Sequence, residues 1–222
     1  MHSSRYEPSR LVSRRFVSSR YWYARRMPAP RGPDPARRSE RAHAAILEAT
    51  RDLIVEVGYD SMSIEGIAAR AGVGKQTIYR WWPSKAAVVL DMWTPEVEEQ
   101  LGFPDTGDLA DDLTTQIGAV IGLVEDPVFS SSFRALVAES QHDEALSAQM
   151  LQRIFHPRIA ACKERLRQAQ EIGQLAADLD LDIAVDLFYG GFYHRYLLRI
   201  APLTRAHAAQ IVQAALAGVG GR

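Results

Sequence analysis

Five polar side chains stand close together between residues 75 and 80, and their chemical types suit contact with a nucleic acid. They are Lys75, Gln76, Thr77, Tyr79 and Arg80. Lys, Arg, Thr and Tyr side chains donate hydrogen bonds to phosphate oxygens, and a Gln amide can pair with adenine through two hydrogen bonds. Ile78, the apolar residue among them, is expected to face inward. The cluster predicts a short helix whose outer face meets DNA or, as the plainer alternative, one half of an αα-hairpin inside some helical domain.

A second helix and a tight turn precede this cluster and would position it. Ser63 suits an N-cap, because its hydroxyl can satisfy a backbone N–H at the start of a helix. The apolar residues Ile64, Ile67, Ala68 and Ala71 follow at the i, i+3, i+4, i+7 spacing of one helix face. Gly72 suits the left-handed residue that ends a helix, Val73 anchors the turn, and the next helix spans 75–81. Two helices of about eight residues joined by a Gly-containing turn are typical of the helix-turn-helix.

The run Thr77-Ile78-Tyr79-Arg80-Trp81-Trp82-Pro83-Ser84-Lys85 resembles a signature of the TetR family of transcriptional regulators. In that family the pattern Thr-hydrophobic-Tyr-x-x-[Phe/Trp]-Pro-Ser-Lys closes the DNA-binding domain. The upstream residues Ile67-Ala68-x-x-Ala71-Gly72-Val73 also match. Gly74 departs from the usual Ser cap, and Gly66 departs from the usual polar residue or Ala.

The resemblance implies an all-α protein with an N-terminal three-helix helix-turn-helix domain over 39–86. It implies a C-terminal helical domain for ligand binding and dimerisation over 87–222. Double-stranded DNA would be the partner, with Ser63 among the DNA-binding residues and with Tyr79 and Lys85 on phosphates. Lys75, Gln76, Thr77 and Arg80 would face base edges. The body also resembles a subgroup marked by Pro104-Asp105-Thr106-Gly107 and Leu187-Phe188-Tyr189-Gly190.

Composition sets broad limits on what the chain can be. Its 222 residues, 47% hydrophobic and 24% charged, are those of an ordinary globular protein. The apolar runs are too short to cross a bilayer, which predicts a soluble protein with no membrane partner. The single cysteine, Cys162, excludes an internal disulfide and favours a cytoplasmic location. Residues 1–38 hold ten Arg and two acids, whereas 94–222 hold ten basic and eighteen acidic residues, so an anionic partner is expected at the N-terminal end.

The basic segment 1–38 shows no sustained helical period and is rich in proline, so we expect a mostly disordered arm. Three interpretations of it stay open. It can touch the DNA backbone or minor groove. It can be a targeting peptide, although it lacks a clean amphipathic helix. Or translation begins at Met27, which leaves a leader of the length that TetR-like proteins usually carry.

Helical periodicity recurs through the rest of the chain, and no period-2 strand pattern appears. One helix is expected to begin at the cap Ser39 and end at Gly58, and another to run from Ser84 to the break at Pro95. Further helices are predicted at 108–124, 128–141, 143–172 (interrupted at Pro157 and ended by Gly173), 181–200 and 204–218.

The helix at 181–200 contains LFYGGFYH, eight residues without a formal charge. A helix that is apolar nearly all round must be covered on all sides. We therefore predict a homodimer through 181–200 and 204–218, as the family resemblance also implies. The alternative is a central helix of a monomer.

An effector cavity is expected between the helices of the body, because aromatic residues gather there. The candidate residues are Phe129, Phe133, Phe155, His156, Phe188, Tyr189, Phe192 and Tyr193. Ligand sites in helical domains are mainly apolar with a few directed polar groups. The sequence predicts a largely apolar, uncharged or weakly polar effector near Phe133, His156 and Phe192, and the alternative is that these aromatics are packed core.

Other functions find little support in the sequence. Asp178, Asp180, Asp182 and Asp186 lack the Gly and distal Glu of a Ca²⁺ loop, and no zinc, phosphate-loop or nucleophile motif appears. We expect no metal, no cofactor and no enzyme. The expected function is a repressor released from a pseudo-palindromic operator by a small molecule. The alternatives are a helical ligand carrier or enzyme whose hairpin only resembles a DNA reader, and a regulator that is ligand-independent or activating.

Overall fold

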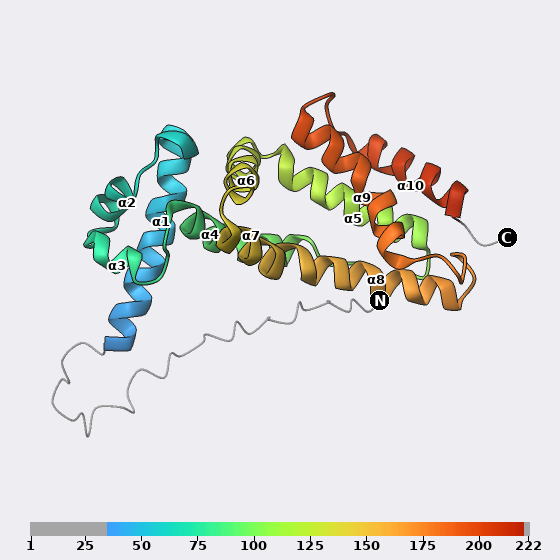
Figure 1. Ribbon diagram of the computed structural model, residues 1–222, viewed down its shortest axis with the longest axis horizontal. Helices are drawn as coiled ribbons and strands as arrows, with labels where there is room; N and C mark the ends of the chain where they lie inside the picture. The colour runs from blue at the N-terminus through green and yellow to red at the C-terminus, as the bar shows by residue number, and fades with distance from the viewer. Residues whose placement is uncertain (1–34, 220–222) are drawn as a thin grey trace, which may run out of the picture. The chain divides into compact units, whose positions relative to one another are not determined.

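A computed structural model describes residues 35–219, and its regular elements are all helices (Figure 1). In chain order they are α1 (Pro35–Ser61), α2 (Ile64–Ala71), α3 (Lys75–Tyr79), α4 (Lys85–Gln100), α5 (Leu109–Glu125), α6 (Pro127–Ser140), α7 (Glu144–Met150), the π-helical turn η1 (Leu151–Phe155), α8 (His156–Glu171), α9 (Leu181–Leu198) and α10 (Arg205–Val219). The all-α prediction is confirmed. The predicted arm at 1–38 falls almost wholly outside the described residues.

The first helix starts earlier than its predicted cap. Ser39 lies inside α1, which begins at Pro35, because proline has the fixed φ that suits a first helical turn. Gly58 has a φ of 78°, the left-handed conformation expected there, and one more turn follows it to Ser61.

The helix after the TetR-like signature is longer than predicted. Ser84 caps it as expected, since Ala87 N donates to Ser84 Oγ at 3.2 Å. The helix does not stop at Pro95 but continues to Gln100. Proline there removes one backbone hydrogen bond, and the burial of Trp93, Thr94 and Val97 around it holds the helix together.

The predicted helix at 143–172 is interrupted just before Pro157. α7 passes into η1, and α8 begins at His156. Pro157 has no N–H to continue the α-helical ladder, and a π turn widens the helix by about one residue at that point. Gly173, with a φ of 76°, ends the segment as predicted.

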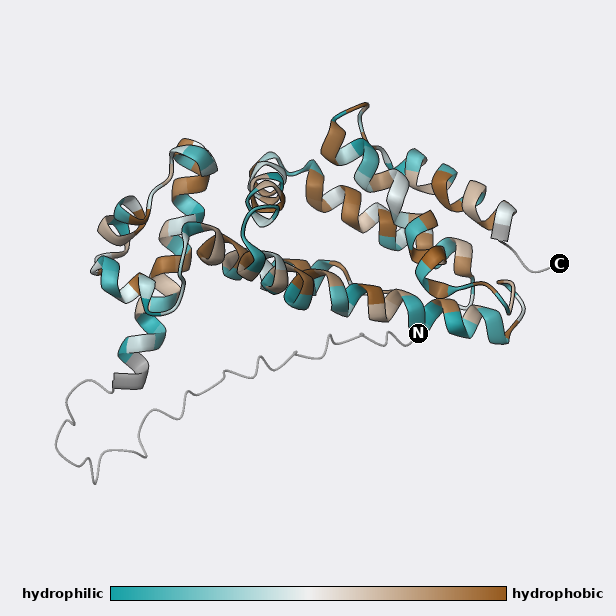
Figure 2. Ribbon diagram, viewed as in Figure 1, coloured by the Kyte–Doolittle hydropathy of each residue, from teal (hydrophilic) through white to brown (hydrophobic). Residues whose placement is uncertain are grey.

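The core of the body is built around α5, which packs against α10 and α6. Its buried residues include Leu113, Ile117 and Ile121, each fully excluded from solvent. Apolar residues recur along the α5 ribbon in Figure 2, whereas α8 alternates between apolar and polar positions. On the other side of the core, α9 buries Ala184, Phe188, Phe192 and Tyr196, which repeat every four residues.

The Pro104–Gly107 segment owes its place to a buried ion pair. Arg165 Nε lies 2.7 Å from Asp112 Oδ2, and their side chains are 3% and 0% exposed. The same carboxylate accepts hydrogen bonds from Thr106 N at 3.0 Å and Thr106 Oγ1 at 2.8 Å. Asp105 adds a second carboxylate 3.6 Å from Arg165. The segment that resembles a subgroup marker is thus a strap that ties α5 to α8.

Candidate nucleic-acid interface and effector cavity

Local chemistry fixes the turn between α2 and α3. Gly66 N donates to Ser63 Oγ at 3.1 Å, which is the predicted N-cap of α2. Gly72 ends α2 with a φ of 66°, and Val73 N then bonds Ala68 O at 3.0 Å. Ile67 and Ile78 are fully buried and hold the two helices together. The helix-turn-helix predicted from the sequence is therefore present.

The outer face of α3 carries the predicted polar side chains. Lys75, Gln76, Tyr79 and Arg80 are exposed, and Thr77 is half-buried. Lys75 Nζ pairs with Glu65 Oε1 at 2.9 Å, a contact between α3 and α2 that was not predicted from the sequence. The Arg80 guanidinium lies over the Trp81 ring, 4.9 Å from its centroid and within the roughly 6 Å typical of cation–π pairs. This face has free polar atoms and positive charge, as contact with DNA requires.

Lys85 has a different environment from the one the family resemblance implies. Its Nζ donates to Tyr59 O at 3.0 Å and Met62 O at 3.3 Å, and it lies 4.4 Å from the centroid of the Tyr59 ring. A cation that bonds the last carbonyls of a helix stabilises that helix end. Lys85 therefore connects the start of α4 to the end of α1, and its contact with a phosphate stays a prediction.

Replacing Lys85 with Met tests that role. The side chain keeps its length but loses its charge and hydrogen bonds, so we expect the free energy of unfolding to fall by about 1–3 kcal/mol. Urea denaturation measures the change, and Lys75→Met is the control, because Lys75 is exposed and should matter little for stability. Wild-type stability of Lys85→Met, together with weaker DNA binding, would return Lys85 to a phosphate-binding role.

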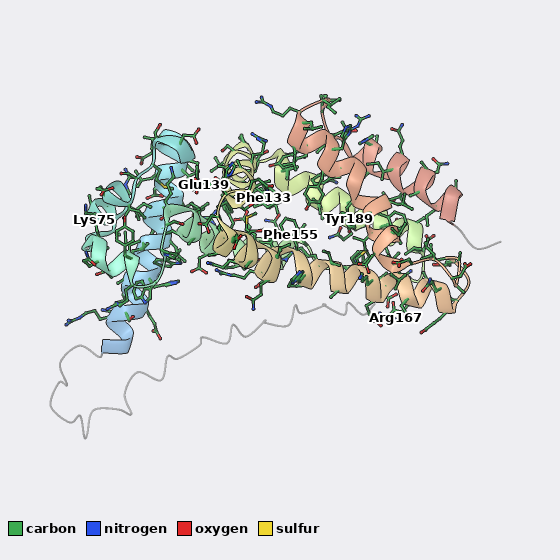
Figure 3. The ribbon with its side chains drawn as sticks, in the orientation of Figure 1. Lys75, Phe133, Glu139, Phe155, Arg167 and Tyr189 are labelled. Carbon is green, nitrogen blue, oxygen red and sulfur yellow. The ribbon has the colours of Figure 1, made fainter. Side chains whose placement is uncertain are left out.

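The body contains a cavity of about 230 Å³ lined by residues of α4, α5, α6, η1, α8 and α9. Six of the eight predicted effector residues line it: Phe129, Phe133, Phe155, Tyr189, Phe192 and Tyr193. Figure 3 shows Phe133, Phe155 and Tyr189 directed into the space between these helices. The aromatic rings also contact one another, with Phe129 and Phe133 stacked at 5.7 Å.

Two predicted effector residues lie elsewhere. His156 is exposed at the start of α8, and Phe188 is fully buried in the core without reaching the cavity. The cavity instead receives Arg158 and Cys162 from α8, and Gln116 from α5, none of which was predicted. The sequence does carry a signal for two of them, because Ile154, Arg158 and Cys162 follow at intervals of four and so lie on one helix face.

Most polar groups of the cavity are neutral near neutral pH. Burial raises the pKa of the Cys162 thiol to about 12. It likewise raises the pKa of Tyr193 to about 12, and it raises that of Tyr189 well above its ordinary value. The Tyr189 hydroxyl donates to Gln116 Oε1.

One carboxylate connects the cavity wall to the DNA-binding helices. Asp91 of α4 pairs with Arg153 of η1 and accepts a hydrogen bond from Trp82 Nε1 at 3.2 Å. His43 Nε2 of α1 lies 3.2 Å from the same carboxylate, and the His43 ring packs on Trp82 at 4.7 Å. The turn η1 therefore contributes Ile154 and Phe155 to the cavity wall and Arg153 to the ion pair with Asp91.

Comparisons with known proteins agree with this arrangement. Residues 46–92 match the family model "Bacterial regulatory proteins, tetR family", and residues 103–215 match "Tetracyclin repressor-like, C-terminal domain". The chain is 33% identical to the HTH-type transcriptional regulator YdeS of Bacillus subtilis over 82% of this chain and 91% of that protein. It is 28% identical to the DNA-binding transcriptional repressor TetR of Mycobacteroides abscessus, over 79% of this chain and 92% of that protein.

A solved structure shows the same fold. The TetR family transcription regulator SCO0332 has 36% sequence identity and a TM-score of 0.67, with 81% of this chain and 98% of that chain covered. The relatives are named as regulators rather than as enzymes, and regulators of this kind bind DNA and dimerise. No helix within residues 35–219 is long and apolar enough to span a membrane. The chain belongs to the TetR family of helix-turn-helix transcriptional regulators.

Proposed function

We propose that this regulator is a homodimeric, cytoplasmic repressor that leaves a pseudo-palindromic operator when a small molecule enters the cavity of the body. Residues 39–86 form the DNA-binding domain in this proposal, and residues 87–222 form the ligand-binding and dimerisation domain. The two family-model matches, at 46–92 and 103–215, support that division.

The observation that carries the proposal is the position of η1. One face of this turn lines the cavity through Ile154 and Phe155, and Arg153 on the same turn pairs with Asp91. Asp91 in turn contacts Trp82, which follows α3. A ligand that displaces the wall of the cavity would therefore shift the groups that hold α3 in place. Two sites are coupled only when a ligand makes different contacts in the two conformations of the protein.

Repression is supported by the relative from Mycobacteroides abscessus, which is named a DNA-binding transcriptional repressor. A reporter gene placed behind the DNA upstream of the regulator's own coding sequence tests the direction of control. Deleting the regulator should raise expression of the reporter. A fall in expression would indicate an activator instead.

Dimerisation is supported by an uncovered apolar face on α9. Ile183, Leu187 and Leu197 are 53%, 45% and 38% exposed, and they lie on the face opposite the buried residues of that helix. Gly190, which lies between them, is also exposed, and a Cβ atom there would meet nothing within 4 Å. A face of this kind suits close approach of a second copy in a two-fold dimer.

Arg80→Ala tests the DNA-reading role of α3. If Arg80 pairs with a base edge, its loss should cost about 1–3 kcal/mol of binding free energy, or roughly five- to 150-fold in Kd. Fluorescence anisotropy with a labelled upstream duplex measures the loss, and a scrambled duplex of equal length shows whether it is specific for sequence. Arg167→Ala is the charge-matched control, because Arg167 is exposed on α8, away from α3 (Figure 3). Equal losses on both duplexes would assign Arg80 to phosphates, and no loss would remove α3 as the reader.

A further inference from the structure

The cavity of the body is apolar except at a few positions, and one of these is a guanidinium. Arg158 projects from α8 into a wall that is otherwise built mainly from Phe, Val, Leu and Ile side chains. Burying a charge in such surroundings is costly unless the charge is paired and hydrogen-bonded. The pairing of Arg158 therefore decides what the cavity can hold.

Arg158 is only partly satisfied by the protein. Its Nη1 donates to the carbonyl oxygen of Ile154 in η1. Its Nε is buried and has no hydrogen-bond partner. Within residues 35–219, no carboxylate lies within 4.0 Å of the Arg158 guanidinium, in contrast to Arg153 and Arg165, which are both paired. Burial lowers the pKa of Arg158, while the more distant Glu98 favours its charged form.

The other titratable groups around the cavity leave this positive charge unopposed inside it. Tyr189, Tyr193 and Cys162 all have raised pKa values, mainly because they are buried, and so stay neutral near neutral pH. Asp186 is the one acidic residue in the lining, and it is exposed on α9, at the mouth of the cavity rather than in its interior.

We propose that the cavity binds an amphipathic carboxylate, with its carboxylate on Arg158 and its hydrocarbon or aryl tail among Phe129, Phe133, Phe155 and Phe192. This inference rests on the proposed function and names the chemical class of its effector. A carboxylate would accept hydrogen bonds from the Arg158 guanidinium, and Arg is the side chain that binds carboxylates with two parallel hydrogen bonds. The volume of about 230 Å³ lies below the usual range of ligand pockets, so the tail is short. The charged head differs from the uncharged effector that the sequence predicted.

Matched head groups on one tail test the proposal. Octanoate, octan-1-ol and octylamine share an alkyl chain, and 4-phenylbutyrate, 4-phenylbutan-1-ol and 4-phenylbutylamine share an aryl tail. Isothermal titration of the full-length protein at pH 7.4 gives the Kd of each probe. A charge-assisted hydrogen bond in a buried site predicts that each carboxylate binds about tenfold or more tightly than its alcohol, and that the amines bind most weakly.

Three variants locate the preference in the site. Arg158→Gln should bring the carboxylate and alcohol affinities to within about threefold of each other while leaving alcohol binding unchanged, which also shows that the cavity is intact. Arg158→Lys keeps the charge and should retain a preference for carboxylates. Asp186→Asn, at the mouth, should retain or strengthen that preference. Circular dichroism and thermal melting compare the folding of all three variants with that of the wild type.

The outcomes separate this proposal from the proposed function. The carboxylate proposal would be overturned if alcohols or amines bind the wild-type protein as tightly as carboxylates do. It would also be overturned if no carboxylate binds up to millimolar concentration. A folded Arg158→Gln variant that still prefers carboxylates over alcohols would overturn it as well. Anisotropy with operator DNA is measured in parallel. Carboxylates that bind through Arg158 without weakening DNA binding would support the ligand class and contradict effector-controlled release. An alcohol that binds better than its carboxylate and releases DNA would contradict the ligand class and support effector-controlled release.

Discussion

Asp112→Asn should lower the free energy of unfolding by about 3–5 kcal/mol. The change removes the charge that compensates Arg165, whose side chain is 3% exposed, and it weakens the hydrogen bonds that hold Thr106. Breaking a buried ion pair leaves an uncompensated charge inside the protein, and Asp105 at 3.6 Å offsets part of that cost. Urea denaturation at pH 7 measures the loss.

The double variant Asp112→Leu/Arg165→Met and the single variant Arg167→Met complete this test. Replacing both partners with apolar side chains should cost far less than Asp112→Asn, because no charge remains buried. Arg167 lies two residues from Arg165 but is 51% exposed, so its loss should have little effect. If Asp112→Asn is as stable as Arg167→Met, the pair does not hold the strap.

The same pair gives a pH dependence with a definite sign. Burial alone would raise the pKa of Asp112, but the hydrogen bonds from Arg165 and Thr106 outweigh it and lower the pKa below its ordinary value of 3.8. A carboxyl group whose folded-state pKa is lowered stabilises the protein above its unfolded pKa, and this contribution is lost as the pH falls below about 3.8. The wild type should therefore lose more stability on acidification than Asp112→Asn does.

Leu187→Arg should convert the protein into a monomer. Leu187 is 45% exposed in the middle of α9, and a two-fold axis on this face would bring the new Arg close to its own copy. A monomer engages one half-site, so affinity for the full operator should fall by a factor of about 10²–10⁴. Light scattering coupled to size exclusion gives the mass, and anisotropy gives the affinity.

Ile172→Arg is the control for that substitution, because Ile172 is 61% exposed at the end of α8, off the α9 face. It should leave both the mass and the DNA affinity unchanged. A dimeric Leu187→Arg protein that keeps wild-type affinity would place the dimer interface elsewhere.

The features that the sequence predicted well depend on neighbouring residues. The caps Ser63 and Ser84 and the left-handed Gly72 act within a few residues of the helix ends they define, so local chemistry was enough to find them. The inward position of Ile78 was also predictable, because it depends on residues only a few positions away in the chain. The aromatic cavity was also predictable, because a few helices can bury that many rings only against one another.

The features that could not be predicted from the sequence depend on residues far apart in the chain or on a change of helical period. Lys85 meets carbonyls 23–26 positions earlier, and no local pattern shows that contact. His156 lies away from the cavity for a geometric reason. An α-helix turns about 100° per residue, so His156 points about 200° away from both Ile154 and Arg158, which line the cavity.

The π turn η1 also lets the body tolerate a change in chain length there. A π-helical turn holds about one residue more than an α-helical turn, so Leu151–Phe155 can lose one residue by closing into an ordinary α-helical turn. Such a deletion would leave α8 in nearly the same rotation relative to α7, so Arg165 would stay beside Asp112 and Cys162 beside the cavity. A one-residue deletion within α8 itself would instead rotate the residues that follow it by about 100°. Related sequences that keep this cavity can therefore carry a one-residue gap at 151–155, whereas a gap within 156–171 marks a body with a different interior.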